Sequence, residues 1–378
     1  GGADGGDAGG VAVESGAPSA DAPTGSVEAP DRIGETNVQV AGLDEPDLVK
    51  TDGRHFYYAP STGPRTVVVE GDDGPEKVRR AGKGNLVGAS QPADPEAVAA
   101  IDHAGEMLQT GDRLLVLQHD RILGYDISDP SNPEVVWEHP LEASLVTARE
   151  RNGTVYLVTE SHVGPDPVCP LTPLGDAQPV DCGAVYHPSG QIPVDATYTA
   201  FALDADDGAV QDSASFVGTN RNTVVYMSHD ALYVTYTESV SRADRRAEFF
   251  LEDFDRTPRS LADRIREIRS YDISAYSQGR EIEAAVRSWL ASLDEDERAE
   301  VRAELSDQYG DYLGDRQRDL QRTGIVRVDV EGTRLSVETT GSVPGRPLNQ
   351  FSLDQHDGTL RVATTIPGAG DADSVNDL

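Results

Sequence analysis

Short apolar runs and polar turns alternate along most of this chain from residue 38 onward. The runs are rich in Val, Ile, Tyr, Thr and Leu, and they are separated by Gly, Asp, Asn and Pro. β-branched and aromatic residues favour strands, whereas Gly, Pro, Asn and Asp favour turns. The pattern therefore predicts a succession of antiparallel β-strands.

The clearest part of the pattern is residues 113–138, where three strand-like runs follow one another. The reversal before the third run has the sequence DPSNP at 129–133, which is typical turn chemistry. The same arrangement returns, with insertions, elsewhere in the chain. The other units cover 46–60 with 66–70, 154–161 with 198–218, 222–239 with 323–343, and 349–367.

These repeats predict the fold class. Each unit holds about four strands, which is the size of a propeller blade. We predict an all-β fold, a β-propeller of four-stranded antiparallel blades over residues 34–378, with about four and a half blades in this chain. Because blades are protected by closing a ring, we expect a C-terminal continuation or a partner chain to complete it.

Two segments interrupt the repeats. Residues 162–197 are rich in Pro and carry both cysteines, so we expect an ordered surface loop. Residues 241–322 change to a helical period, which predicts a helical hairpin or bundle with a solvated charged face. Good helix starts lie at Thr257-Pro258 and at Asp294 to Glu297. The predicted apolar helix positions are Leu261, Ile265 and Ile268, then Ile282, Val286, Leu290 and Leu293, then Val301 and Leu305.

Charge narrows the possible environment and partners. The chain has 66 acidic and 32 basic residues, a formal net charge of -34, and lysine occurs only at Lys50, Lys77 and Lys83. Such an acidic, lysine-poor composition is typical of proteins from halophilic archaea, because high salt screens the self-repulsion. Nucleic acid is excluded as a partner, since binding it requires cationic side chains on the phosphates.

Residues 1–33 form a Gly/Ala/Ser-rich acidic segment without a large apolar cluster, which predicts a flexible spacer. Such a spacer could separate the blades from a membrane or lipid anchor encoded upstream, and we expect membrane contact only through that anchor. No run of eighteen apolar residues is present, so the sequence predicts no membrane-spanning segment.

The only cysteines, Cys169 and Cys182, lie in the same loop. A local disulfide is the favoured interpretation, and it indicates an oxidising compartment. Two separate thiols, or half of a metal site, are the alternatives. Zinc is disfavoured because no CxxC and no second pair lies nearby.

Catalytic motifs are missing from the sequence. It contains no GxSxG, HExxH, GxxxxGK[ST] or GxGxxG segment, and its eight histidines are scattered. We therefore expect no catalytic residues and no cofactor. Calcium is the one ion to consider, because Asp204, Asp206 and Asp207 precede Gly208, and Asp371 and Asp373 lie near the end. Hairpin-turn chemistry is the favoured interpretation of both groups.

A longer motif opens the repeats. The segment TNVQVAGLDEPDLVKTDG at 36–53 resembles the opening signature of the secreted proteins with a C-terminal β-propeller domain, found in archaea and some bacteria. The segments 348–354 and 360–365 are similar to a strand pair of the same family. The resemblance covers 34–378 and implies a propeller, export and a surface or lipoprotein-like existence, without any established activity. Within the motif, Asp44, Glu45 and Asp47 could ligate an ion or cap backbone amides where the ring closes.

The sequence thus favours an exported cell-surface propeller that acts as a non-enzymatic binding or scaffold module for a protein or glycan. One alternative is an extracellular hydrolase or lyase whose site lies in the propeller channel. Another is a structural subunit of a surface layer or filament, joined to its neighbours by strand addition.

Overall fold

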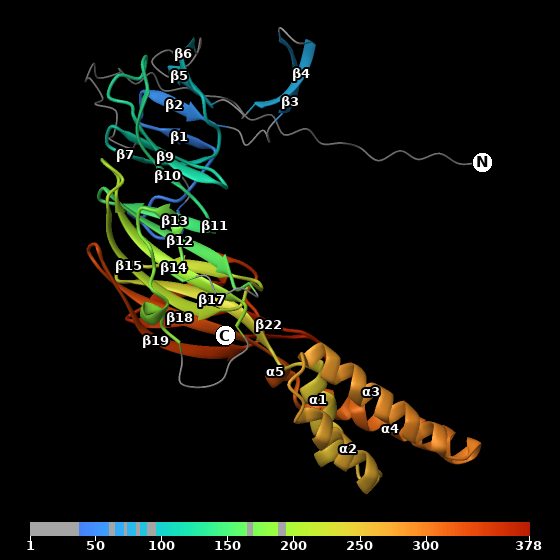
Figure 1. The fold of residues 1–378 in the computed structure, drawn as a ribbon. Helices are drawn as coiled ribbons and strands as arrows, with labels where there is room; N and C mark the ends of the chain where they lie inside the picture. Colours follow the sequence, from blue (N-terminus) through green and yellow to red (C-terminus); the bar gives the residue numbers. More distant parts are fainter. Residues whose placement is uncertain are drawn as a thin grey trace, which may run out of the picture.

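Four antiparallel sheets of four strands form most of the structure, a computed structural model that describes residues 38–59, 65–71, 74–80, 84–88, 96–164, 169–187 and 194–378. The predicted spacer at 1–33 lies outside the described residues. The sheets are stacked face to face in chain order, as blades are (Figure 1). The predicted fold class, an all-β propeller with a helical insertion, is confirmed.

The blades follow the predicted repeats. Blade 1 consists of β1 (Val49–Thr51), β2 (His55–Tyr58), β5 (Gly84–Gly88) and β6 (Glu96–Ile101). Blade 2 consists of β7 (Glu106–Thr110), β8 (Arg113–Leu117), β9 (Arg121–Asp126) and β10 (Glu134–Pro140). Blade 3 consists of β11 (Ser144–Arg151), β12 (Thr154–His162), β14 (Ala196–Asp204) and β15 (Val210–Gly218). Blade 4 consists of β16 (Val224–Met227), β17 (Ala231–Ser239), β18 (Gln321–Glu331) and β19 (Arg334–Pro344).

Two short strand pairs and a separate hairpin complete the β-structure. After the 3-10 turn η3 (Gln350–Ser352), β20 (Leu353–His356) pairs with β21 (Thr359–Val362), and β22 (Thr364–Ile366) pairs with β23 (Val375–Asp377). The predicted strand at 66–70 is present in β3 (Arg65–Gly71), but it pairs with β4 (Gly74–Arg80) outside blade 1. The third and fourth strands of blade 1 are instead β5 and β6.

The hydrophobic core lies between neighbouring blades. One cluster joins blades 1 and 2, a second joins blades 2 and 3, a third joins blades 3 and 4, and a fourth joins blade 4 to β20 and β21. Central strands therefore bury both faces, and the seven residues Ala231–Thr237 of β17 are all buried. This explains why these strands have continuous apolar runs instead of strict alternation.

The chain reaches blade 1 through residues 38–48, which we call the entry segment. The first strands of the four blades, β1, β7, β11 and β16, lie next to one another and form what we call the inner edge. The entry segment crosses this edge. Its backbone pairs with Met107 of β7 and with Glu150 of β11. At the start of the entry segment, the side-chain amide of Gln39 donates to the backbone carbonyls of Gln350 and Leu353, at 2.8 and 2.9 Å. The entry segment therefore links blades 2 and 3 to the strands that follow blade 4.

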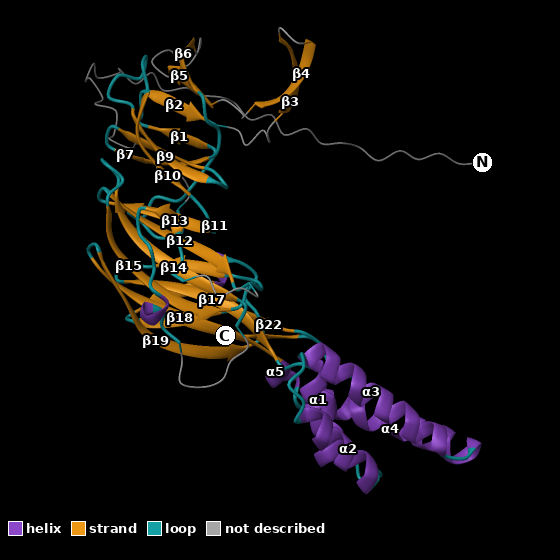
Figure 2. Cartoon of the chain, in the orientation of Figure 1, coloured by secondary structure: helices purple, strands orange, loops and turns teal. Residues whose placement is uncertain are grey.

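The helical insertion projects from blade 4 as an arm (Figure 2). It contains α1 (Arg242–Glu248), a π-helical turn η2 (Phe249–Asp253), α2 (Arg259–Arg269), α3 (Ala275–Ser292), α4 (Glu295–Asp315) and α5 (Gln317–Leu320). Its apolar positions build a core of their own, with Ile265, Ile268 and Ile282 fully buried. The helix starts expected near Pro258 and Asp294 are confirmed by α2 and α4. None of the helices in the described part of the chain has the length and apolar character needed to cross a bilayer.

Candidate functional site

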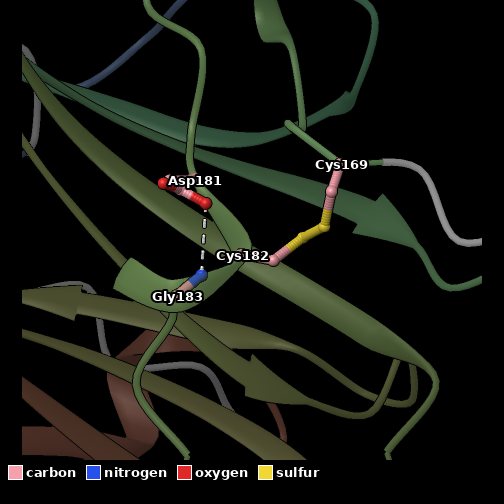
Figure 3. The surroundings of a disulfide bond; sticks show 4 residues. All are labelled: Cys169, Asp181, Cys182 and Gly183. Carbon is pink, nitrogen blue, oxygen red and sulfur yellow. Dashed lines mark hydrogen bonds between the residues drawn. A yellow bond between two sulfur atoms is a disulfide. The ribbon is translucent and has the colours of Figure 1, made fainter.

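Residues 163–195 form the disulfide loop, which connects β12 to β14. Cys169 and Cys182 are bonded, with their Cα atoms 5.9 Å apart (Figure 3), which confirms the favoured interpretation of the two cysteines. Cys182 opens the short turn η1 (Cys182–Ala184), and the Asp181 carboxylate caps this turn by accepting from the Gly183 N–H. The disulfide therefore fixes one end of a capped turn.

Backbone hydrogen bonds hold the disulfide loop across the blades. Near β13 (Pro173–Asp176), the Glu142 N–H at the end of blade 2 donates to the carbonyl of Pro173. Leu171 and Val180 exchange two hydrogen bonds within the loop, at 2.9 and 2.7 Å. Tyr186 donates to Ser215 and accepts from Val217, so it occupies part of the outer edge of blade 3. The described residues 169–187 of the loop thus form an ordered layer against blades 2 and 3.

A groove of about 420 Å³ lies between this loop and the outer strands of two blades. The groove is lined by Gln178, Pro179, Val180, Asp181, Ala184 and Tyr186 of the loop, by Ser213 to Ser215 of β15, and by Leu335 to Val337 of β19. Val180 and Leu335 are buried, whereas Asp181 and Ser336 are exposed. Its volume falls in the range of pockets that hold small molecules.

The blade edges that frame the groove are locked together. The Asp212 carboxylate at the start of β15 accepts from the Leu335 N–H of β19, at 2.8 Å. The hydroxyl of Ser215, which lines the groove, lies 2.9 Å from the hydroxyl of Thr199 and shares a hydrogen bond with it. The Asp212–Leu335 hydrogen bond joins blade 3 to blade 4 where the groove lies, whereas the Ser215–Thr199 hydrogen bond joins two strands within blade 3. Such a site is preorganised, so a ligand would lose little affinity to ordering of the protein.

The three acidic residues of the opening motif lie in the entry segment. The Lys50 ammonium, only 4% exposed, is 2.5 Å from Asp44 Oδ1, and Asp44 Oδ2 accepts from the Gln109 N–H. Glu45 Oε1 accepts from the Gln39 N–H, and Asp47 accepts from the adjacent Leu48 N–H. Of the two predicted roles, capping of backbone amides is therefore the one that the structure shows.

Arg149 completes this charge network. Its side chain is 5% exposed, its Nε lies 3.6 Å from Glu45 Oε1, and it donates to Gln350 Oε1 at 2.7 Å. Gln350 in turn donates to Glu45 Oε2 at 3.0 Å. Burial lowers the pKa of the Arg149 guanidinium, while Glu45 and Asp44 oppose that shift. The buried cation is thus paired with the entry segment, so the network positions that segment on the inner edge.

Metal binding finds no support within the described ranges, which hold no group of three or more His, Cys, Asp or Glu that could bind an ion. The calcium site at Asp44, Glu45 and Asp47 remains a prediction. The acidic residues before Gly208 form a hairpin turn, as expected. There, Asp204 accepts from the Asp206 N–H. Asp371 and Asp373 lie between β22 and β23.

Glu150, whose backbone pairs with Asp44 of the entry segment, should make the stability of the protein depend on pH. Burial raises its pKa above the ordinary value of 4.5, although the Gly153 N–H donates to it at 2.7 Å. A raised pKa in the folded state stabilises the protein at low pH, and this contribution is lost as the pH rises through that pKa. Glu150→Gln stays neutral, so its melting temperature relative to wild type should increase from pH 4 to neutrality. A constant difference across that range would contradict this prediction.

The disulfide allows a test of loop order. Replacing both cysteines by serine should destabilise the loop by up to about 3 kcal/mol, because a cross-link around a loop of this length restricts the unfolded chain. Thermolysin should then cut within 163–195 faster than in wild type, while cleavage in the arm stays unchanged. Equal cleavage rates in the oxidised wild type and the serine variant would show that the backbone pairing alone orders the loop.

Sequence reasoning did not find the groove. Its lining residues come from 178–186, 213–215 and 335–337, which carry no motif and are brought together only by blade stacking. Nor did the sequence indicate the partners of Asp44 and Glu45. The only available signal was the pair of cysteines, which marked the loop as structured.

Comparisons with known proteins agree with this architecture. A family model described as Beta propeller domain matches residues 33–378. An uncharacterized protein of Archaeoglobus fulgidus is 36% identical over 340 residues, which cover 89% of this chain and 53% of that protein. An uncharacterized protein of Methanocaldococcus jannaschii is 27% identical over 343 residues, 89% of this chain and 50% of that protein.

The chain therefore spans about half the length of these curated relatives. Among solved structures, the N-terminal domain of Nup159 matches 51% of this chain and 61% of its own, with 10% identity and a TM-score of 0.21. The family match extends over almost all of the sequence and includes every blade. On this evidence, the chain belongs to the Beta propeller domain family.

Proposed function

We propose that this protein is an exported, non-enzymatic binding module at the cell surface of a halophilic archaeon. The stacked blades serve as a rigid support, and the groove beneath the disulfide loop serves as the ligand site. The observation that carries the proposal is this groove of about 420 Å³, framed by a disulfide-bonded loop and two locked blade edges. Binding residues commonly lie on loops that a rigid scaffold positions.

Two further observations support the location outside the cell. Disulfides persist in oxidising compartments and are rare in reducing ones, and both cysteines of this chain are bonded. The net charge of -34 suits a surface bathed in concentrated salt. In intact cells of a halophilic host, we expect both cysteines to resist alkylation until a reductant is added. Rapid alkylation without reductant would place the protein in a reducing compartment.

The inner edge of the blades is a poorer candidate for the site. The entry segment covers it, and its charges are already paired: Lys50 with Asp44, and Arg149 with Glu45. Catalysis requires groups free to contact a substrate, with pKa values matched to proton transfer. We therefore place the binding function at the loop face.

Binding is tested with the full chain and washed cell envelopes of a halophilic archaeon. Wild-type protein should bind saturably, and replacing both cysteines by serine should weaken binding at least tenfold because the groove loses its frame. The matched control is Asp176→Asn, which changes an exposed carboxylate of the same loop outside the groove. Absence of saturable binding, or equal binding by the serine variant, would overturn the proposed function.

A further inference from the structure

We infer that the groove beneath the disulfide loop binds a neutral saccharide. The inference rests on the proposed function and names its ligand class. Six groove side chains can hydrogen-bond: the hydroxyls of Ser213, Ser215, Ser336 and Tyr186, the amide of Gln178 and the carboxylate of Asp181. Hydroxyls and amides both donate and accept, which matches the hydroxyl groups of a sugar ring.

The charge of the groove selects against anionic ligands. Asp181 is the one charged side chain among its described lining residues, and the chain as a whole carries a net charge of -34. A phosphate, sulfate or uronate in the groove would find no cation to pair with and would lie beside the Asp181 carboxylate. A carboxylate accepts hydrogen bonds strongly, so Asp181 can bind two sugar hydroxyls without a counter-charge.

The groove also offers apolar surface of the right kind. The Tyr186 side chain is 36% exposed at the groove, and buried Val180 and Leu335 contribute to its lining. Tyrosine combines an apolar ring with a polar hydroxyl. A sugar has C–H faces between its hydroxyls, so it can use both parts of this side chain. The mixture of one aromatic ring with several hydroxyls therefore suits a saccharide better than a lipid.

Peptides are disfavoured by the state of the blade edge. An extended peptide binds a sheet by pairing with free backbone groups of an edge strand. On β15, the carbonyl of Ser215 and the N–H of Val217 already pair with Tyr186. Strand addition at this point of β15 is therefore blocked. A ligand at this point of β15 has to be recognised through side chains, as a saccharide is.

Native affinity electrophoresis tests the inference with the full chain in gels containing neutral polysaccharides, namely an α-glucan, a mannan and a galactan. Dextran sulfate is the anionic comparison. Wild type should be retarded by at least one neutral polymer and not by dextran sulfate. Tyr186→Ala should weaken retardation about tenfold because it removes the aromatic ring and its hydroxyl, and Asp181→Asn should do the same because it removes the charged acceptor. Asparagine can still cap η1, so the second variant keeps the local fold.

Two controls separate binding from folding. Tyr186→Phe keeps the ring and should retain more affinity than Tyr186→Ala, and Asp176→Asn should bind as wild type does. All variants should have the circular dichroism spectrum of wild type. Absence of retardation by every neutral polymer, or equal retardation of wild type and both groove variants, would overturn the saccharide assignment.

The assignment can fail while the proposed function stands. Periodate cleaves vicinal diols and should abolish binding of wild type to cell envelopes if the ligand is a saccharide. Envelope binding that survives periodate but is lost in the cysteine variant would indicate a protein ligand, which refutes this inference alone. Envelope binding that is independent of the disulfide would refute the proposed function itself.

Discussion

Trp137→Ala should lower the free energy of unfolding by about 3–5 kcal/mol, as expected for removing a large buried aromatic side chain. Trp137 lies on the outer strand of blade 2 and is 9% exposed. Its indole N–H donates to the carbonyl of Ala205 in blade 3, at 3.0 Å. The ring also fits against Gly124 and Gly208, where an added methyl group would overlap it. The substitution therefore opens a cavity between two blades.

Urea denaturation provides the measurement. Trp137→Phe is the matched control, because it keeps an aromatic ring and loses the hydrogen bond, and we expect it to lose less stability than Trp137→Ala. Gly208→Ala should also be destabilising, since Gly208 has a φ of +73° and its new methyl group would lie 2.6 Å from the indole. An alanine variant at 137 within 1 kcal/mol of wild type would show that the blades repack around the gap.

Arg149→Met should be comparably damaging, with a loss of about 3–5 kcal/mol, because it removes one partner of a buried ion pair. The arginine donates to Thr147 Oγ1 at 2.6 Å, to the Ala148 carbonyl at 2.7 Å and to Gln350 Oε1 at 2.7 Å. Without it, the Glu45 carboxylate, which is 17% exposed, keeps its charge but loses its cationic partner. The entry segment should then detach more readily from the inner edge.

The control for this variant is Arg266→Met on the helical arm. Arg266 pairs with Asp263 at 2.8 Å, but both side chains are more than half exposed, so the pair contributes at most about 1 kcal/mol. Combining Arg149→Met with Glu45→Gln should recover part of the lost stability, since the unpaired charge is removed as well. Equal effects of the variants at 149 and 266 would mean that the network contributes no more than a surface ion pair.

The sequence predicted the parts of this fold that local patterns determine. The helical arm was predicted as 241–322 and extends from Arg242 to Leu320, because its apolar positions repeat with a helical period over several turns. The three strands in 113–138 and the disulfide were predicted for similarly local reasons. Within the predicted helical segment, α1 and η2 were not distinguished as separate elements, because they are short and show no clear apolar period.

Long-range pairing accounts for what the sequence could not predict. Strand β5 contains glycine at both ends, and β6 is rich in alanine, so neither carried a strong strand signal, and 66–70 was assigned to blade 1 in their place. The contact between Arg149 and Gln350 joins positions 201 residues apart. The groove depends on three such distant segments. Proximity of this kind follows from blade stacking and not from any single stretch of sequence.

The entry segment also has a consequence for how the protein is made. Residue 39 leaves the ribosome long before residue 350, yet its amide is bonded to that residue, 311 positions later in the chain. The Gln39 side chain must therefore wait for the carbonyls of Gln350 and Leu353 while more than three hundred further residues are synthesised. Gln39 is thus synthesised early but completes its contacts only after the strands that follow blade 4 have been made.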